Sequence, residues 1–254
     1  MEVTILGTGT SQGVPVIACP CEVCMSNDPH DKRLRTSAML SSKATQVVID
    51  AGPDFRHQMI THKVRRLDAV LITHGHKDHT GGLDDVRAFN WVQKKHMDIY
   101  ARAGVQASIQ REFPYAFGDD KYPGSPDINL HLLSDEPFRI GDFHFVPIEA
   151  MHQEMPVVGF RTGDFSYLTD ASMIESAEIE KMKGSRVIVL NALRKEKHHS
   201  HFNLSEAVEL LQYLKPEKAY LTHISHQMGL HQAIQKDLPE GIFLAYDGLR
   251  IGMD

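Results

Sequence analysis

Apolar residues occur along the chain in short, uninterrupted runs that end at polar residues or glycine. Such runs, rich in Val, Ile and Leu, predict strands that are covered on both faces. The clearest are residues 3–6, 46–50, 69–72, 143–148, 186–190 and 219–222. The sequence also predicts a hairpin (157–162 with 165–169) and a closing pair of strands (242–246 with 249–251).

Segments with helical character lie between these strands. They are residues 55–62, 83–91, 104–113, 172–183 and the stretch after Asn203. In the last of these, apolar residues recur at helical spacing from Leu204 to Leu214, and Asn203 with Glu206 forms the pattern of a capping box. Strands that alternate with helices in two runs indicate an α/β protein built from two similar halves. A length of 254 residues fits one large domain, residues 1–254.

Residues 104–133 are the least regular part of the chain. Beyond a first helical stretch they are rich in aromatic residues, proline and glycine, which break any periodic pattern. Three interpretations stay open: an insertion over a substrate pocket, a contact in a homodimer, or a plain surface loop.

Residues 73–82 hold the densest group of metal-binding side chains. His74, His76, Asp78 and His79 fall within six residues, directly after the predicted strand 69–72. Functional side chains of α/β proteins commonly lie on loops at the carboxyl ends of strands. Imidazole and carboxylate ligands suit Zn, Mn or Fe ions. A His-rich surface loop is the alternative, but this order of residues directly after a strand favours a metal site.

A second candidate site is formed by cysteines. Cys19, Cys21 and Cys24 lie close enough to bind one ion from a single loop, but a structural zinc takes four N or S ligands. His226 is the candidate for the fourth, because it follows the predicted strand 219–222 closely. A redox cluster is the alternative.

The cysteine count also bears on location. Cys19, Cys21 and Cys24 are the only three cysteines in the sequence and cannot form a disulfide framework, so we expect a reducing, cytoplasmic location.

The motif of residues 74–79 resembles the signature of the metallo-β-lactamase superfamily of metal-dependent hydrolases. The resemblance implies a four-layer αββα sandwich, with two sheets face to face and helices outside. It also implies three further ligands at strand ends, His152, Asp170 and His223, and a supporting role for Asp50. One divalent ion would be held by His74, His76 and His152 and a second by Asp78, His79 and His223, with Asp170 bridging the two.

A closer resemblance is to the cyclic-phosphate phosphodiesterase family of the bacterial carbon–phosphorus lyase pathway, which breaks down phosphonates. It rests on residues 7–9 and 12–15, the three cysteines, residues 73–79 and residues 221–227. The resemblance implies a structural zinc on Cys19, Cys21, Cys24 and His226, two catalytic ions (Mn, Zn or Fe), and His201 as a catalytic residue near the leaving group. The two ions would activate a water for attack on phosphorus, and Asp78 would help to orient that water.

The implied substrate is a small phosphodiester such as a ribosyl 1,2-cyclic phosphate or a cyclic nucleotide. Three alternatives remain: a tRNA-processing endoribonuclease of the same superfamily, a glyoxalase-type thioesterase, and a non-enzymatic metal-binding module. The cysteine cluster does not fit the thioesterases, and an intact ligand set argues against the last. A β-lactamase is disfavoured, because that class carries Cys where this chain has Asp170.

Composition narrows the partners further. The net charge of −6 disfavours long nucleic acid, and no apolar stretch approaches the length of a membrane span. The first residues lack the basic segment of a signal peptide. We therefore expect a cytoplasmic enzyme with a small substrate, and the sequence allows a homodimer.

Overall fold

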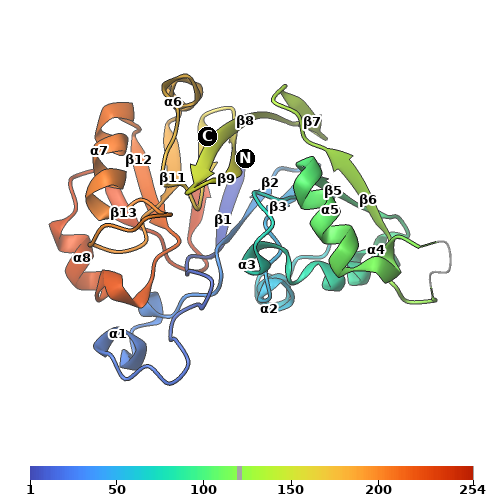
Figure 1. Cartoon of the computed structure of the whole chain (residues 1–254), viewed down its shortest axis with the longest axis horizontal. Coiled ribbons are helices and arrows are strands. Elements are labelled where there is room, and N and C mark those ends of the chain that lie inside the picture. Colours follow the sequence, from blue (N-terminus) through green and yellow to red (C-terminus); the bar gives the residue numbers. More distant parts are fainter. Residues whose placement is uncertain (119–121, 254) are drawn as a thin grey trace.

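The computed structural model describes residues 1–118 and 122–253, and residues 119–121 of the irregular stretch 104–133 lie outside the described part. Two sheets of seven strands form the centre (Figure 1). The first has the order β14 (Arg250–Gly252), β1 (Glu2–Gly7), β2 (Ser37–Ser41), β3 (Gln46–Ile49), β4 (Ala69–Leu71), β5 (Met97–Ala101) and β6 (Ile128–Leu132). Strands β3 to β6 are parallel, and the others pair antiparallel.

The second sheet repeats this arrangement. Its order is β13 (Ile242–Leu244), β12 (Lys218–Thr222), β11 (Val187–Asn191), β10 (Phe165–Leu168), β9 (Met155–Thr162), β8 (Phe143–His152) and β7 (Phe138–Ile140). Strands β10 to β13 are parallel, and β7 to β10 pair antiparallel. The two similar halves predicted from the sequence are therefore visible as two sheets, each with four parallel strands.

Helices cover the outer face of each sheet. The first sheet carries α2 (Phe55–Thr61), α4 (Arg87–Gln93) and α5 (Ala103–Glu112), and the second carries α6 (Ser176–Met182), α7 (Leu204–Leu214) and α8 (His231–Asp237) (Figure 1). Two one-turn helices, α1 (Glu22–Met25) and α3 (Lys77–Thr80), lie in loops. Short 3₁₀ turns occupy Pro29–Asp31, Leu83–Val86, Pro114–Ala116 and His226–Met228.

Three hydrophobic cores explain why the strands are apolar throughout. Val47 and Ile49 of β3 face the core between the sheets, whereas Val48 faces the core under the helices. In β11 the inter-sheet core takes Val187 and Val189, and the helices of the second half cover the alternate residues. Since successive side chains of a strand point to opposite faces, a strand between two cores must be apolar at every position. This four-layer αββα sandwich confirms the predicted fold.

Several predicted boundaries were wrong. The predicted helix 83–91 is a 3₁₀ turn followed by α4, and the predicted helix 172–183 begins only at Ser176. Its first residues are extended, because Met173 forms a backbone bridge with Met151. The closing strands do not pair with each other: β13 joins β12 in the second sheet, and β14 joins β1 in the first.

Within the described residues, no helix combines the length and apolar character that a membrane crossing requires.

Candidate metal centre

The predicted ligands meet at the carboxyl ends of four strands. The loop after β4 carries His74, His76, Asp78 and His79. His152 is the last residue of β8, which continues beyond its predicted end at residue 148. Asp170 and His223 follow β10 and β12. Both have left-handed backbones, with φ of 60° and 54°. Non-glycine residues adopt this conformation rarely, and its cost is commonly accepted at functional sites.

One cluster consists of Asp78, His79, Asp170 and His223. Its four ligand atoms lie within 4.8 Å of one another. Nε2 of His79 is 3.2 Å from Asp78 Oδ2 and 3.3 Å from Asp170 Oδ2, and Nε2 of His223 is 3.0 Å from Asp170 Oδ1. All of these residues except Asp78 are almost fully buried. This is the set that was predicted to hold the second ion together with Asp170.

The other predicted ligands lie close to Asp170 and to one another. Nε2 of His74 lies 3.1 Å from Nδ1 of His76 and 3.9 Å from Asp170 Oδ1. The ring of His152 is 5.1 Å from that of His76 and 5.8 Å from that of His74. Ligand atoms of His152, Asp170 and His201 also lie within 4.8 Å of one another. Asp170 is therefore the residue shared by both clusters, as expected for a bridging carboxylate.

Hydrogen bonds behind the clusters fix how the imidazoles point. Nδ1 of His79 donates to Asp50 at 2.6 Å, and Nδ1 of His152 donates to the carbonyl of Ser200 at 2.7 Å. The Thr73 hydroxyl donates to Asp50 at 2.8 Å and lies 3.0 Å from Nδ1 of His74. Each of these contacts leaves Nε2 facing the cluster, which is how proteins orient metal-ligating histidines.

The donor atoms fit metal ions. Among the described residues, Nε2 of His79 and both ring nitrogens of His223 are buried without a hydrogen-bond partner. Burial alone would raise the pKa of Asp170, but the neighbouring His223 and His79 hold it well below its usual value. Burial alone would lower the pKa of His223, but the neighbouring Asp170 raises it to about 9. A carboxylate buried among imidazoles in this way suits divalent cations, whose binding requires deprotonated ligands.

His201 lies beside this centre. Its ring is 4.8 Å from that of His223 and 4.5 Å from that of His152, and Nδ1 is 3.9 Å from Asp170 Oδ1. Nδ1 is buried with no hydrogen-bond partner in the described structure. Burial, with His223 nearby, lowers the pKa of His201 to about 2, so the imidazole is neutral. His199 is exposed, whereas His198 is half-buried with its ring 5.3 Å from that of His201.

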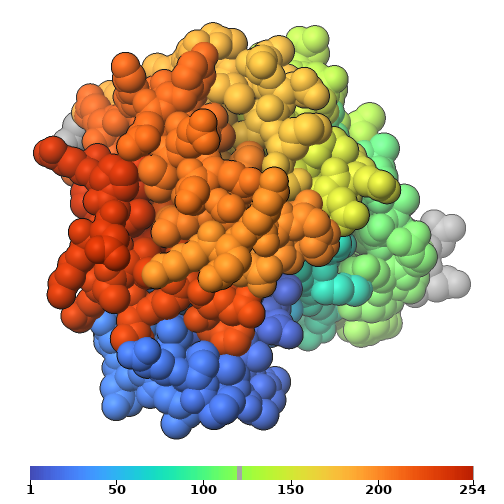
Figure 2. Space-filling model, turned by 60° about the vertical axis from the view of Figure 1, so that its left-hand side comes forward, coloured from blue at the N-terminus to red at the C-terminus, as the bar shows by residue number. Residues whose placement is uncertain are grey.

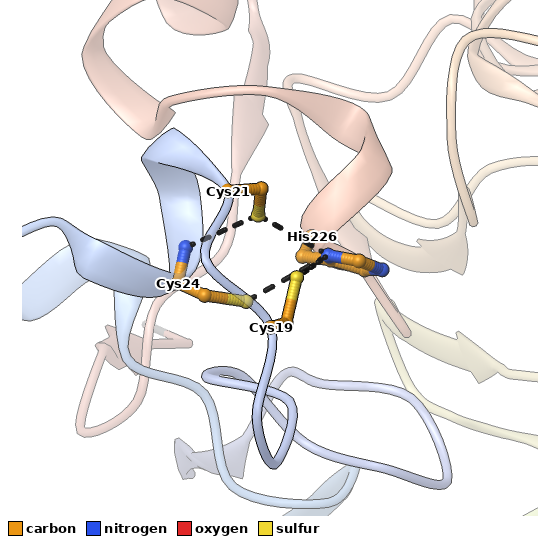
Figure 3. A group of neighbouring side chains, drawn as sticks. All are labelled: Cys19, Cys21, Cys24 and His226. Atoms are coloured by element: carbon orange, nitrogen blue, oxygen red, sulfur yellow. Dashed lines mark hydrogen bonds between the residues drawn. The ribbon is translucent and has the colours of Figure 1, made fainter.

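The cysteine site assembles from both ends of the chain. Sγ atoms of Cys19, Cys21 and Cys24 lie 3.4, 3.3 and 3.7 Å from Nδ1 of His226 (Figure 3). A tetrahedral zinc with bonds of about 2.3 Å to sulfur and 2.0 Å to nitrogen places these atoms about 3.5 Å apart. The N-terminal loop that carries the cysteines packs beneath the C-terminal part of the molecule (Figure 2). The four residues therefore have the spacing of a zinc site that links the two.

Two backbone amides donate hydrogen bonds to the cysteine sulfurs, an interaction that stabilises thiolates. The amides of Cys24 and Val16 donate to the Sγ atoms of Cys21 and Cys24 at 3.5 and 3.3 Å. The amide of Cys24, with His226 in support, lowers the pKa of Cys21 to about 6, whereas burial raises that of Cys24 to about 11. Both the donor set and its support match a structural zinc.

Two features of the centre were missed from the sequence. Thr73 connects Asp50 to His74, and the only signal was its place between the strand and the first histidine. The carbonyl of Ser200, which orients His152, has no sequence signal, because backbone carbonyls occur at every residue.

A sandwich of this kind with His and Asp clusters that share one carboxylate is typical of one class of proteins, the metal-dependent hydrolases. The chain belongs to the metallo-β-lactamase superfamily: the family model "Beta-lactamase superfamily domain" matches residues 45–224. This membership confirms the broader resemblance seen in the sequence.

The relatives of this chain carry names of different enzymes. An "Octanoyltransferase" of Porphyromonas gingivalis is 39% identical over 100% of this chain and 52% of that protein. A "Ribonuclease Z" of Nostoc punctiforme is 27% identical over 65% of this chain and 47% of that protein. The chain thus spans about half the length of these curated relatives. A solved structure described as "a New Diphosphatase from the PhnP Family" has a TM-score of 0.93 and 37% identity, over 100% of this chain and 98% of that one.

Proposed function

We propose that this protein hydrolyses small phosphodiesters, among them cyclic phosphates such as ribosyl 1,2-cyclic phosphate or cyclic nucleotides. The observation that carries the proposal is Asp170, whose carboxylate lies next to histidines of both clusters: Oδ2 lies 3.3 Å from Nε2 of His79, and Oδ1 lies 3.0 Å from Nε2 of His223 and 3.9 Å from Nε2 of His74. Two ions bound side by side would lower the pKa of a water and stabilise the charge that develops on a phosphoryl group.

The protein's own residues have distinct roles in this proposal. Asp78 is the least buried ligand of its cluster and its Oδ2 reaches both His79 and His223, so it can accept a hydrogen bond from a water held there and orient it. His201 stands at the edge of the centre with an unpartnered Nδ1. A neutral imidazole at this place can donate one hydrogen bond to a phosphoryl oxygen or to the departing oxygen.

The relative described as a diphosphatase supports phosphoryl chemistry, because it covers the whole chain at 37% identity. It also widens the substrates that need testing. Metal-loaded protein should be assayed against bis(p-nitrophenyl) phosphate, a ribosyl 1,2-cyclic phosphate, a 2′,3′-cyclic nucleotide and an organic diphosphate. We expect turnover of the diesters that disappears with chelator and returns with Mn²⁺ or Zn²⁺. Turnover of the diphosphate alone would show that the enzyme cleaves anhydrides and would contradict the proposal.

The endoribonuclease alternative is favoured by one observation, the similarity to ribonuclease Z over 65% of the chain. The net charge of −6 argues against it, since long nucleic acid is bound mainly through cations. A tRNA precursor belongs in the same assay, and cleavage of it at a rate above that of the small diesters would decide for the alternative. A glutathione thioester tests the thioesterase alternative in the same way.

Metal analysis addresses the cofactors of the proposal. We propose two catalytic ions, Mn, Zn or Fe, and one structural zinc. Protein purified without chelator should then hold about three metal ions per chain, of which one stays zinc when the growth medium is enriched in Mn²⁺. We also propose a cytoplasmic location and a small-molecule substrate, with a homodimer left open.

A further inference from the structure

A cavity of about 310 Å³ opens directly beside the metal centre. It lies between the first turns of α5 and the end of the β8–β9 hairpin, and His76 forms part of its wall. Met155, which also lines it, is the cross-strand partner of His152. One of the three histidines predicted to hold one ion therefore lines this cavity, and the strand partner of a second lines it too. A group attached to a phosphoryl centre at that ion would lie next to the cavity.

The wall of the cavity is mostly apolar. Val105, Met155, Pro156 and Val157 contribute side chains, and Gly75 and Gly104 contribute backbone. The hydroxyl of Ser108 accepts a hydrogen bond from Arg111 at 2.9 Å. Besides His76 and Ser108, the polar side chains of the wall are Arg102 and Glu149, which pair with each other. A pocket whose wall is mostly apolar selects for apolar surface.

The charged groups at the rim bind one another. The guanidinium of Arg102 donates to Glu149 and to Asp135, both at 2.6 Å, and to the carbonyl of Leu133 at 3.3 Å. One cation therefore faces two carboxylates. A second anionic group on the substrate would meet net negative charge here, whereas an uncharged group would not.

The absence of a side chain at Gly104 keeps part of the cavity open. A Cβ added at Gly104 would meet no atom within 4 Å, and its backbone is not left-handed. Gly104, Val105 and Ser108 lie at helical spacing on the face of α5 that lines the cavity. A large side chain at residue 104 would thus fill the space without displacing its surroundings.

From these observations we infer that the cavity is a substrate subsite for an uncharged, apolar group, an alkyl chain or a single aromatic ring, carried on the phosphoryl group that binds the metal centre. The inference rests on the proposed function for its phosphoryl substrate. It narrows that function to phosphoesters with an apolar substituent and disfavours those whose substituent carries a second phosphate.

Binding of simple phosphonates tests the subsite without requiring hydrolysis. The dissociation constants of methylphosphonate, hexylphosphonate and phenylphosphonate are measured by calorimetry on the metal-loaded protein. Each buried methylene contributes about a fourfold gain in affinity. Hexylphosphonate has five more methylenes than methylphosphonate, and if half of their surface is buried it should bind about 30-fold more tightly, with a more negative heat-capacity change.

Three variants locate the effect. Gly104→Phe should reduce the preference for hexylphosphonate over methylphosphonate to less than about threefold. Gly104→Ala also removes the glycine from the helix, but it does not fill the cavity and should keep the preference. Gly252→Phe adds the same ring at another glycine whose Cβ would meet no atom within 4 Å, on β14 far from the cavity, and should also keep it.

The outcomes separate this inference from the proposed function. Equal affinities for the three phosphonates in the wild type, or a preference that survives Gly104→Phe, would overturn the subsite even if bis(p-nitrophenyl) phosphate is hydrolysed. A preference that depends on residue 104, in a protein that hydrolyses no phosphodiester, would keep the subsite and remove the proposed reaction.

Discussion

Replacing Cys21 by Ser should remove one metal ion from this protein while leaving the catalytic clusters in place. Cys21 Sγ is one of three sulfurs grouped around Nδ1 of His226, at 3.3 Å. A hydroxyl at this position is a poor zinc ligand, and three remaining ligands do not close a structural site. The loop that carries the cysteines has only a small apolar core, Val14, Val23 and Cys24, so a zinc that ties it to His226 should stabilise its docked position.

The size of the effect follows from mass action. A ligand present at a thousand times its dissociation constant stabilises the folded state by about 4.1 kcal/mol. For a chain of 150–250 residues, each 1 kcal/mol shifts Tm by about 2–4 °C. Loss of the zinc should therefore lower Tm by about 8–16 °C when the free zinc concentration is that high.

The assay combines metal analysis with calorimetric melting. Zinc content should fall by about one ion per chain, and the fraction that stays folded should keep its catalytic ions and its turnover. Met25→Ala is a matched control, because Met25 lies on the same helix turn and its side chain is exposed. A Cys21→Ser protein with the wild-type zinc content and Tm would refute the structural-zinc assignment.

Three further substitutions test the catalytic centre. Asp170→Ala removes the shared carboxylate and should lower both metal content and phosphodiester turnover, the latter by at least about 10²-fold; full activity would contradict a bridge. Asp50→Asn keeps the shape but loses the charge that accepts from His79, so a metal titration should show affinity about 10–100-fold weaker, and an unchanged affinity would refute the supporting role. His201→Ala should keep metal and Tm while turnover falls by about 10²–10⁴-fold, less for p-nitrophenolate esters. Loss of metal from that variant would instead make His201 a ligand.

The fold could be predicted for strands in which every residue is buried and therefore apolar. Strands β3, β4 and β11 lie between two cores, and their uninterrupted apolar runs were recognised. β5 was missed, because it alternates: Met97, Ile99 and Ala101 are buried, while Asp98 and Tyr100 are only partly covered. β6 was missed for a similar reason. It lies at the edge of its sheet, and its Asn129 and His131 bond to Asp98 rather than pack in a core.

The candidate ligands could be predicted because metal-binding residue types in sequence order at strand ends are an unusual pattern. Their geometry could not. Asp50, Asp170 and His223 all have left-handed backbones, with φ of 64°, 60° and 54°. The residue types do not predict this conformation. It is imposed by the neighbouring strands and by the contacts that each side chain makes after folding.

The choice of His201 among three neighbouring histidines also depended on resemblance. The structure supplies a physical reason. Phe202 donates its amide to the carbonyl of Ala171 and accepts from the amide of Leu193, and Ser200 accepts from His152. These long-range bonds hold the loop against the strand end that carries Asp170, and only then does residue 201 point inward while residue 199 stays exposed.

The two metal sites are held together in different ways, and this difference determines what each ion does for the structure. In the catalytic centre, Asp50 orients His79, and the carbonyl of Ser200 orients His152 from behind, on strands that belong to two large cores. Opposite charges within the centre, on Asp170 and on His223, attract each other without any ion. At the cysteine site, by contrast, the ligand atoms are supported only by two amides of their own loop and a small apolar cluster. The catalytic centre is therefore preorganised by the fold, as rapid chemistry requires, whereas a zinc at the cysteine site would add a direct link between the cysteine loop and His226.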